Sequence, residues 1–162
     1  NISKINLVNF RNYSKLSINL GQNMNIFIGN NAQGKTNILE AVYIFSQGRS
    51  HRAKSDKELI KFGEDFSRLS LDFHDSERDY TAAMQLMKNG RKNIKINHVQ
   101  ITKLSKLMNY LNVVMFSPED LEGNTNQTSL AFSKLSASHF RQSSLFSKYF
   151  ISIVLKRTAT HC

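Results

Sequence analysis

The chain has 162 residues, of which 40% are hydrophobic and 10% aromatic, enough to bury the core of one compact domain. It carries 22 Lys and Arg against 12 Asp and Glu, a formal net charge of +10 that is typical of proteins with an anionic partner such as nucleic acid or nucleotide. No apolar run reaches the roughly 18 residues that a membrane-spanning helix needs, and the single cysteine, Cys162, excludes an internal disulfide. These features predict a cytoplasmic protein without a membrane segment.

The charge and composition change after Glu122. The tail from Gly123 to Cys162 holds five basic residues, no acid and many serines and threonines, and its apolar residues follow no sustained period. The first 122 residues therefore carry 17 basic and 12 acidic groups, only a mild basic bias. We divide the chain into an N-terminal lobe, residues 1–122, and an aberrant basic Ser/Thr-rich tail, residues 123–162.

Hydrophobic alternation predicts several strands. The first two lie on either side of a polar turn at Asn9–Ser14, and a third, Met24–Ile28, leads into a glycine-containing loop. Helical spacing begins at Lys35, and this helix should stop near Gly48. The remaining predicted elements are a basic loop at 49–57, a turn at 58–62, strands at 68–73, 80–87 and 93–97, a helix at 100–110 and a strand at 113–116. The Lys88-Asn89-Gly90 turn should join two of these strands, because Asn-Gly tolerates the positive φ of tight hairpins.

The segment between the third strand and the first helix matches the phosphate-binding pattern G-x-x-x-x-G-K-[ST]. Its residues are Gly29, Asn30, Asn31, Ala32, Gln33, Gly34, Lys35 and Thr36. In such loops the backbone N–H groups and the helix N-terminus bind phosphate oxygens, and the lysine neutralises the β- and γ-phosphates of ATP. The threonine hydroxyl joins the coordination shell of Mg²⁺, so Thr36 is the predicted metal ligand. The alternative is a glycine-rich strand-to-helix turn that binds nothing.

Several segments together resemble the bacterial RecF family. They are Asn9-Phe10-Arg11-Asn12-Tyr13, the run Phe27 to Ala41 around the phosphate loop, Gly48-Arg49-Ser50-His51-Arg52, and Phe116-Ser117-Pro118-Glu119-Asp120-Leu121. The resemblance extends over about residues 2–122. It implies an α/β P-loop NTPase of the ABC/SMC head type, whose N-terminal lobe has a mixed and antiparallel sheet around a central P-loop helix.

The same resemblance implies partners and a function. Proteins of this family bind DNA at single-strand gaps, on single-stranded and gapped duplex substrates, and dimerise around ATP. They help to load RecA together with RecO and RecR, in recombinational repair and the SOS response. The resemblance also implies that Arg11 and Asn12 contact the nucleotide, whereas a solvated turn is the alternative for both residues.

The loop after the first helix contains Arg49, His51, Arg52 and Lys54. These side chains could meet nucleotide or DNA backbone through their charge, or form an ordinary solvated basic loop. No Cys or carboxylate stands at ligand spacing from His51, so we do not expect a metal site there.

The family pattern breaks after Leu121, because the ABC signature and the Walker B aspartate are missing. No acid of any kind follows Glu122 to hold Mg²⁺ or to position water, so we expect ATP binding without efficient hydrolysis. Our hypothesis is that the tail reflects a frameshift or a degraded gene copy, and a genuine short paralogue is the alternative. The rival functions are a non-hydrolysing nucleotide- or nucleic-acid-binding module and a small P-loop kinase, and no lid or substrate motif favours the kinase.

Overall fold

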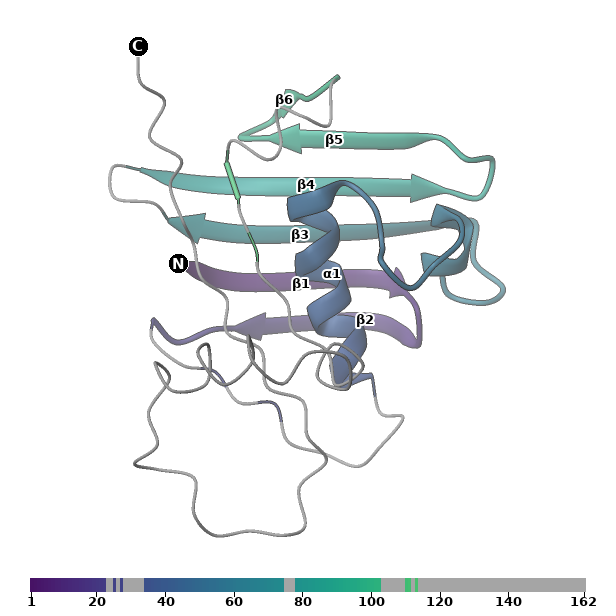
Figure 1. Cartoon of the computed structure of the whole chain (residues 1–162), viewed down its shortest axis with the longest axis horizontal. Helices are drawn as coiled ribbons and strands as arrows, with labels where there is room; N and C mark the ends of the chain where they lie inside the picture. The colour runs from purple at the N-terminus through teal and green to yellow at the C-terminus, as the bar shows by residue number, and fades with distance from the viewer. Residues whose placement is uncertain are drawn as a thin grey trace, which may run out of the picture. The chain divides into compact units, whose positions relative to one another are not determined.

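The structure is a computed structural model that describes residues 1–22, 25, 27, 34–74, 78–102, 110, 111 and 113. Six strands form one sheet in the order β2-β1-β3-β4-β5-β6, and every pair of neighbours is antiparallel. The strands are β1 (Ile2–Phe10), β2 (Tyr13–Asn19), β3 (Phe66–His74), β4 (Asp79–Met87), β5 (Lys92–Ile96) and β6 (Val99–Gln100). A helix, α1 (Lys35–Gln47), lies across one face of the sheet, and a short 3-10 helix, η1 (Asp56–Leu59), follows it in the chain (Figure 1).

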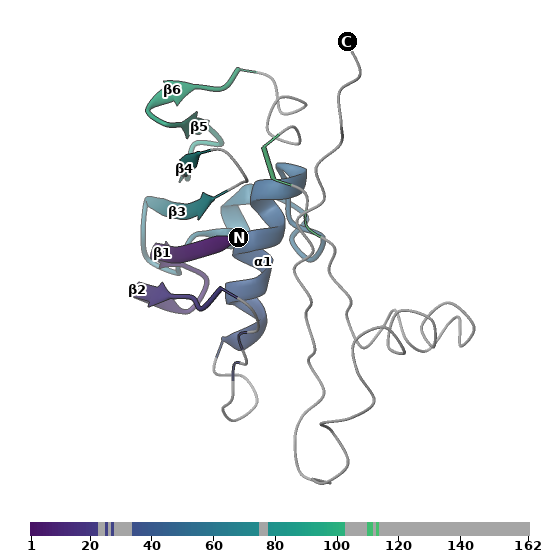
Figure 2. The same ribbon diagram turned by 90° about the vertical axis from the view of Figure 1, so that its left-hand side faces the viewer.

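The core lies between α1 and the sheet, as the view along the strands shows (Figure 2). Strand register places Leu7, Leu69, Met84 and Ile94 side by side on four neighbouring strands, and all four are buried. Burial of each such side chain stabilises the fold by about 1.5 to 3 kcal/mol. The alternate residues of each strand point to the other face, so the period-2 pattern of the sequence decides which face packs against the helix.

The first hairpin and the helix confirm the sequence prediction, but the hairpin turn is tighter than expected. Only Arg11 and Asn12 lie between β1 and β2, since Phe10 already pairs with Tyr13. Arg11 adopts a left-handed backbone conformation with φ of 53°. At the far end of α1, Gly48 has φ of 71° and donates its N–H to the carbonyl of Ile44, so the helix ends where the glycine predicted.

The β4–β5 hairpin turns at the residues that the sequence predicted. The hairpin forms at Lys88-Asn89-Gly90, but only Gly90 adopts a positive φ, of 86°. Three residues lie between Met87 and Arg91, because the backbone N–H of Met87 donates to the carbonyl of Arg91 at 2.9 Å. The Asn89 side chain accepts a hydrogen bond from the backbone N–H of Arg91 at 3.0 Å. A three-residue hairpin loop needs one left-handed residue, and Gly90 supplies it.

A second tight turn contradicts the start of the helix predicted at 100–110. Asn97 and His98 have φ of 46° and 69° and return the chain into β6, which contains Gln100. The side-chain oxygen of Asn97 accepts the backbone N–H of Thr81 at 2.8 Å, which anchors this glycine-free turn. Residues 103–109 lie outside the described residues, and so does the predicted domain boundary at residue 122.

Two predicted strands fall largely on residues that the structure does not describe. They are Met24–Ile28, before the phosphate loop, and Val113–Phe116, of which only Val113 is described and is buried. None of the helices formed by the described residues is both long and apolar enough to cross a membrane.

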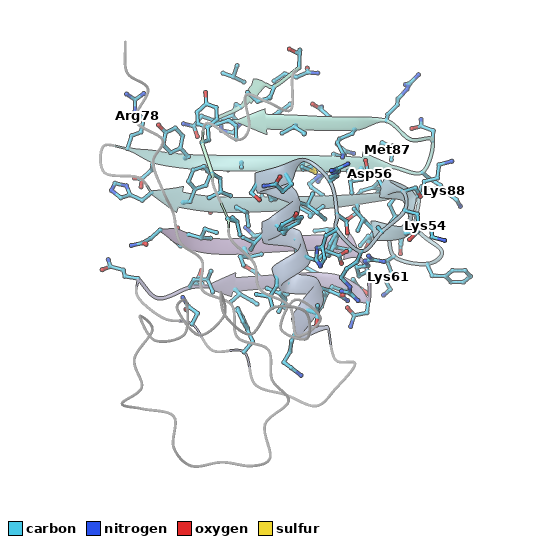
Figure 3. The ribbon with its side chains drawn as sticks, in the orientation of Figure 1. Lys54, Asp56, Lys61, Arg78, Met87 and Lys88 are labelled. Carbon is cyan, nitrogen blue, oxygen red and sulfur yellow. The ribbon has the colours of Figure 1, made fainter. Side chains whose placement is uncertain are left out.

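Lys92 of β5 joins three elements at one end of the sheet. Its ammonium group donates to the carbonyl of Gly48 at 2.7 Å and lies 2.7 Å from the carboxylate of Asp56 in η1. Figure 3 labels Asp56 and Met87, and η1, which contains Asp56, contacts β4, which contains Met87. A cation at the C-terminal end of a helix also interacts favourably with the helix dipole. Lys92 therefore fixes the end of α1 to the sheet and to η1.

We expect Lys92→Met to lower the free energy of unfolding by about 1 to 2 kcal/mol, because it removes two charge-assisted contacts that are only partly exposed to water. Urea denaturation measures this loss. Lys95→Met is the matched control, since Lys95 lies on the same strand with an exposed side chain. An equal loss in both variants would contradict the role of Lys92.

Candidate functional site

The site begins at the N-terminal end of α1. Gly34, the residue before the helix, has φ of 96° and ψ of 5°, a left-handed conformation that glycine adopts without steric cost. No described side chain caps the helix, and its first turn contains no acidic residue. Lys35 and Thr36 are the first two helical residues and are partly buried. The positive end of the helix dipole and the Lys35 charge therefore coincide at the end of the glycine-containing loop.

The β1–β2 turn packs tightly against Gly34. A Cβ atom on Gly34 would lie 2.7 Å from the side-chain oxygen of Asn12 and 2.7 Å from the hydroxyl of Tyr13. The same oxygen of Asn12 accepts a hydrogen bond at 2.9 Å from the side chain of Asn37 in α1. Burial raises the pKa of the Tyr13 phenol. This contact brings Asn12, a predicted nucleotide-binding residue, to the last residue of the loop before Lys35.

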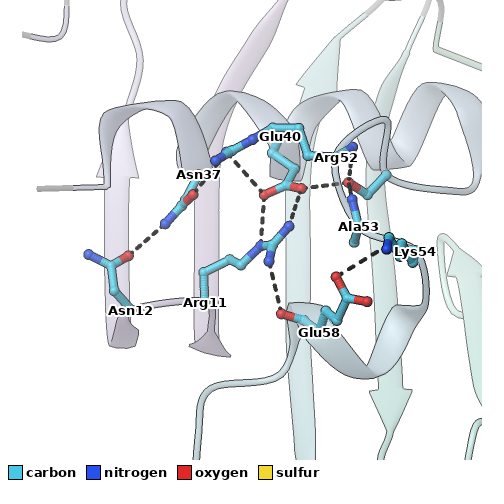
Figure 4. A network of polar contacts seen from close by, with 9 residues as sticks. Arg11, Asn12, Asn37, Glu40, Arg52, Ala53, Lys54 and Glu58 are labelled. Atoms are coloured by element: carbon cyan, nitrogen blue, oxygen red, sulfur yellow. Dashed lines mark hydrogen bonds and ion pairs between the residues drawn. The ribbon is translucent and has the colours of Figure 1, made fainter. Parts of the chain in front are cut away.

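Glu40, on the second turn of α1, is completely buried and receives four contacts (Figure 4). Arg11 donates to it twice, from Nε at 2.9 Å and from Nη2 at 2.6 Å, and Ser50 donates its hydroxyl at 2.5 Å. Nη1 of Arg52 lies 3.7 Å from the same carboxylate. A carboxylate held by a planar guanidinium in this two-pronged way is among the strongest charged pairs in proteins.

Burial by itself raises the pKa of Glu40, but its surroundings reverse the direction. Hydrogen bonds from Arg11 and Ser50, together with the positive charges of Arg11 and Arg52, hold this pKa below its ordinary value. Glu40 is therefore ionised at neutral pH. One carboxylate faces two guanidinium groups, so the cluster keeps one net positive charge.

This pKa shift predicts an acid-sensitive contribution to stability. The contribution is fully present above the unfolded pKa of glutamate, about 4.3, and it is lost as the pH falls through the lower folded pKa. We expect the free energy of unfolding to fall more steeply on acidification in the unchanged chain than in Glu40→Gln. Denaturation at pH steps from neutral downward tests this, with Glu58→Gln, whose side chain is exposed, as control. Parallel curves for the unchanged chain and Glu40→Gln would contradict it.

The predicted site residues that the structure describes have different surroundings. Arg11 lies in the ion pair with Glu40 and also donates to the carbonyl of Glu58 at 3.0 Å, and its role toward nucleotide stays a prediction. Arg52, from the predicted basic loop, donates a hydrogen bond to the side-chain oxygen of Asn37 at 3.3 Å. The ring of His51 packs edge-on against the ring of Tyr43. Residues 29–33 of the phosphate loop lie outside the described residues. Among those described, no cluster of three His, Cys, Asp or Glu could hold a metal.

Sequence reasoning missed Glu40 as the centre of the cluster. A signal was present, because this carboxylate interrupts an otherwise apolar stretch of α1 that includes Leu39 and Ala41. A charge within such a stretch is buried when the helix is covered, and a buried carboxylate requires a cationic partner. The sequence does not indicate which of the arginines supplies it.

Comparison with known proteins decides the family. The model of the RecF/RecN/SMC N terminal domain matches residues 1–147. The chain belongs to this family. Its described antiparallel sheet, with α1 on one face, is the N-terminal lobe of an ABC/SMC-type head, which confirms the predicted fold class.

Sequence relatives point to RecF within the family. The chain is 51% identical over 120 residues to the DNA replication and repair protein RecF of Clostridium tetani, covering 74% of this chain and 33% of that protein. It is 50% identical over 120 residues to RecF of Clostridium botulinum, again covering 74% and 33%. This RecF-like chain thus spans about a third of the length of the proteins that it matches, and it corresponds to their N-terminal part.

Solved structures agree with this assignment. The structure of the recombination mediator protein RecF with ATP superposes with a TM-score of 0.71 at 30% identity, covering 84% of this chain and 39% of that one. The SMC head domain from Thermotoga maritima gives 0.59 at 18% identity and covers 68% and 42%, which shows a common fold.

Proposed function

We propose that this chain is the ATP-binding part of a RecF-like DNA replication and repair protein. The observation that carries the proposal is the start of α1, where Lys35 and Thr36 follow Gly34. The backbone at Gly34 is left-handed, and its neighbours leave no room for a side chain. The loop residues before them are Gly29, Asn30, Asn31, Ala32 and Gln33. Their backbone N–H groups would hold the phosphates, and Lys35 would neutralise the β- and γ-phosphate charge.

Mg²⁺ fits this site as an ion that takes one ligand, Thr36, from the described residues. Thr36 offers a hydroxyl on the first turn of the helix, and the described residues offer no carboxylate cluster to complete a protein cage. Mg²⁺ commonly keeps a few protein ligands and takes the rest from phosphates and water. When bound, the ion would neutralise phosphate charge, and Thr36 would be its ligand from this chain.

The positive charge around the loop supports an anionic ligand. Arg11 and Arg52 outnumber Glu40, and Asn12 adds an amide beside Gly34. We assign Arg11 and Asn12 as the edge of the nucleotide site formed by the β1–β2 turn. The two remaining N–H groups of the Arg11 guanidinium would be available to a phosphate oxygen, since the described residues use three of its five.

The wider proposals follow from similarity to RecF. They are DNA binding at single-strand gaps, ATP-dependent dimerisation, partnership with RecO and RecR, RecA loading in recombinational repair and the SOS response, and a cytoplasmic location. For residues 1–162 by themselves we propose binding of ATP without efficient hydrolysis, because residues 123–162 contain no Asp or Glu. The missing acids also support the second candidate function, a nucleotide-binding module that does not hydrolyse ATP.

The test is a calorimetric titration of ATP with and without Mg²⁺ into the whole chain. We expect saturable ATP binding, with an affinity that Mg²⁺ raises roughly tenfold. Thr36→Val should remove most of this gain in affinity, because it deletes the hydroxyl and keeps the shape of the side chain. Thr81→Val is the control, since Thr81 lies on β4 of the sheet. Absence of saturable binding would end the proposal, and an equal Mg²⁺ effect in Thr36→Val would remove the metal assignment.

A further inference from the structure

Three segments of the chain meet at the carboxylate of Glu40 (Figure 4). Arg11 belongs to the β1–β2 turn, Glu40 to the helix that follows the phosphate loop, and Ser50 and Arg52 to the loop after that helix. The pairs are separated by 29 residues for Arg11 and 10 residues for Ser50. A single buried group thus fixes the spacing between two loops and α1.

Arg11 is held in a defined plane by these contacts. Its Nε and Nη2 groups donate to the two oxygens of Glu40, and Nη1 donates to the carbonyl of Glu58. Its backbone N–H also donates to the carbonyl of Leu59 at 2.8 Å. Since Arg11 has a left-handed φ of 53°, the turn adopts a strained conformation that these bonds maintain.

The residue after Arg11 connects this anchor to the phosphate loop. The Asn12 side chain lies within 2.7 Å of the position of a Cβ on Gly34, and it accepts a hydrogen bond from Asn37 in the first turn of α1. Movement of Arg11 would move Asn12, because the turn contains only these two residues. The position of the turn beside Gly34 therefore depends on the Arg11–Glu40 pair.

We propose that Glu40 is a positioning residue for triphosphate binding, which holds the Arg11–Asn12 turn against the end of the phosphate loop through its two-pronged pair with Arg11. The inference rests on the proposed function, and it assigns to Glu40 no contact with the nucleotide itself. Groups that are held in place before the ligand arrives bind it more tightly, because less conformational freedom is lost on binding.

Charge and position predict opposite effects, which makes the proposal testable. If Glu40 acted only through its negative charge, Glu40→Gln would strengthen the binding of an anion near Arg11 and Arg52. If Glu40 acts by position, the same substitution weakens binding, because an amide presents one acceptor oxygen where the guanidinium needs two. The sign of the change in ATP affinity distinguishes the two roles.

The experiment is a titration of ATP and Mg²⁺ into the whole chain and four variants. We expect Glu40→Gln to bind roughly tenfold more weakly, the effect of losing a charge-assisted hydrogen bond. The double variant Arg11→Gln/Glu40→Gln should bind no more weakly than Arg11→Gln alone, because Glu40 acts through Arg11. Lys92→Met is the control for a stabilising contact at the other end of α1, and its affinity should be unchanged.

Ser50→Ala keeps the proposal testable if Glu40→Gln does not fold. It removes the hydroxyl that donates to Glu40 and leaves the charged pair intact. We expect affinity to fall roughly twofold to fivefold, since one neutral donor is lost. Unchanged affinity in Ser50→Ala, unchanged or tighter binding in Glu40→Gln, or additive losses in the double variant would each overturn the inference. A chain that binds no ATP in its unchanged form would instead contradict the proposed function.

Discussion

Lys35→Ala should weaken the binding of ATP and Mg²⁺ by roughly 30-fold to 100-fold. Lys35 is the first residue of α1 and directly follows Gly34, at the positive end of a helix whose first turn holds no acidic residue. Loss of its ammonium group removes a charge-assisted hydrogen bond to the phosphates and a full positive charge that no other residue of that turn replaces. Calorimetric titration measures the change in the dissociation constant directly.

Two comparisons isolate the role of this lysine. Alanine is a good helix former, so Lys35→Ala should keep α1 folded, and urea denaturation measures any loss of stability separately from the loss of ATP affinity. Lys57→Ala removes an exposed lysine from η1 and should leave ATP affinity within about twofold, because exposed charges are screened at physiological salt. Equal ATP affinity in Lys35→Ala and the unchanged chain would show that α1 does not begin at a phosphate site.

The elements near the site were predictable where local rules decide them. The two strands of the first hairpin followed from period-2 alternation, although the turn between them is shorter than predicted. The end of α1 followed from the left-handed preference of Gly48. Strand β3 begins two residues before and ends one residue after its predicted limits, and β4 begins one residue early. Alternation weakens at strand ends, while pairing with a neighbouring strand continues, and pairing is not visible in a single sequence.

The parts that escaped prediction depend on contacts between distant residues. The β5–β6 turn at Asn97 and His98 contains no glycine, and it is fixed by the backbone N–H of Thr81, which donates to the Asn97 side chain across 16 residues. Lys92 reaches Gly48 across 44 residues. Spacing along the chain reports which residues share a face, but it does not report which faces meet.

The candidate site shows the same division. The phosphate-loop pattern predicts Lys35 and Thr36 as ligand residues because the backbone of such a loop requires glycine at fixed spacing, and their roles stay predictions. In the sequence Glu40 resembles an ordinary helical residue. In the structure it is buried and contacts Ser50 and Arg52 from the loop after α1. Its importance comes from burial, and burial is a property of the assembled fold.

Gly34→Ala should both destabilise the chain and weaken ATP binding. The backbone φ of 96° disfavours any side chain, and the new methyl group would lie within 2.7 to 2.8 Å of atoms of Asn12 and Tyr13. Asn12 cannot move away without losing its hydrogen bond with Asn37. We expect the free energy of unfolding to fall by about 2 to 4 kcal/mol, combining backbone strain with overpacking, and ATP affinity to fall at least roughly tenfold.

Gly63→Ala separates the two causes, because Gly63 has a similar φ of 87° but nothing within 4 Å of the added Cβ. It should lose only the strain component, about 1 to 2 kcal/mol, and keep its ATP affinity. Adding Asn12→Ala to Gly34→Ala removes two of the three crowding atoms and should recover part of the lost stability, while the strain at φ remains. Since the double variant also lacks the Asn12 amide, its ATP affinity should stay low. If Gly34→Ala and Gly63→Ala lost the same stability and both retained ATP binding, the β1–β2 turn would not be packed against the phosphate loop in solution.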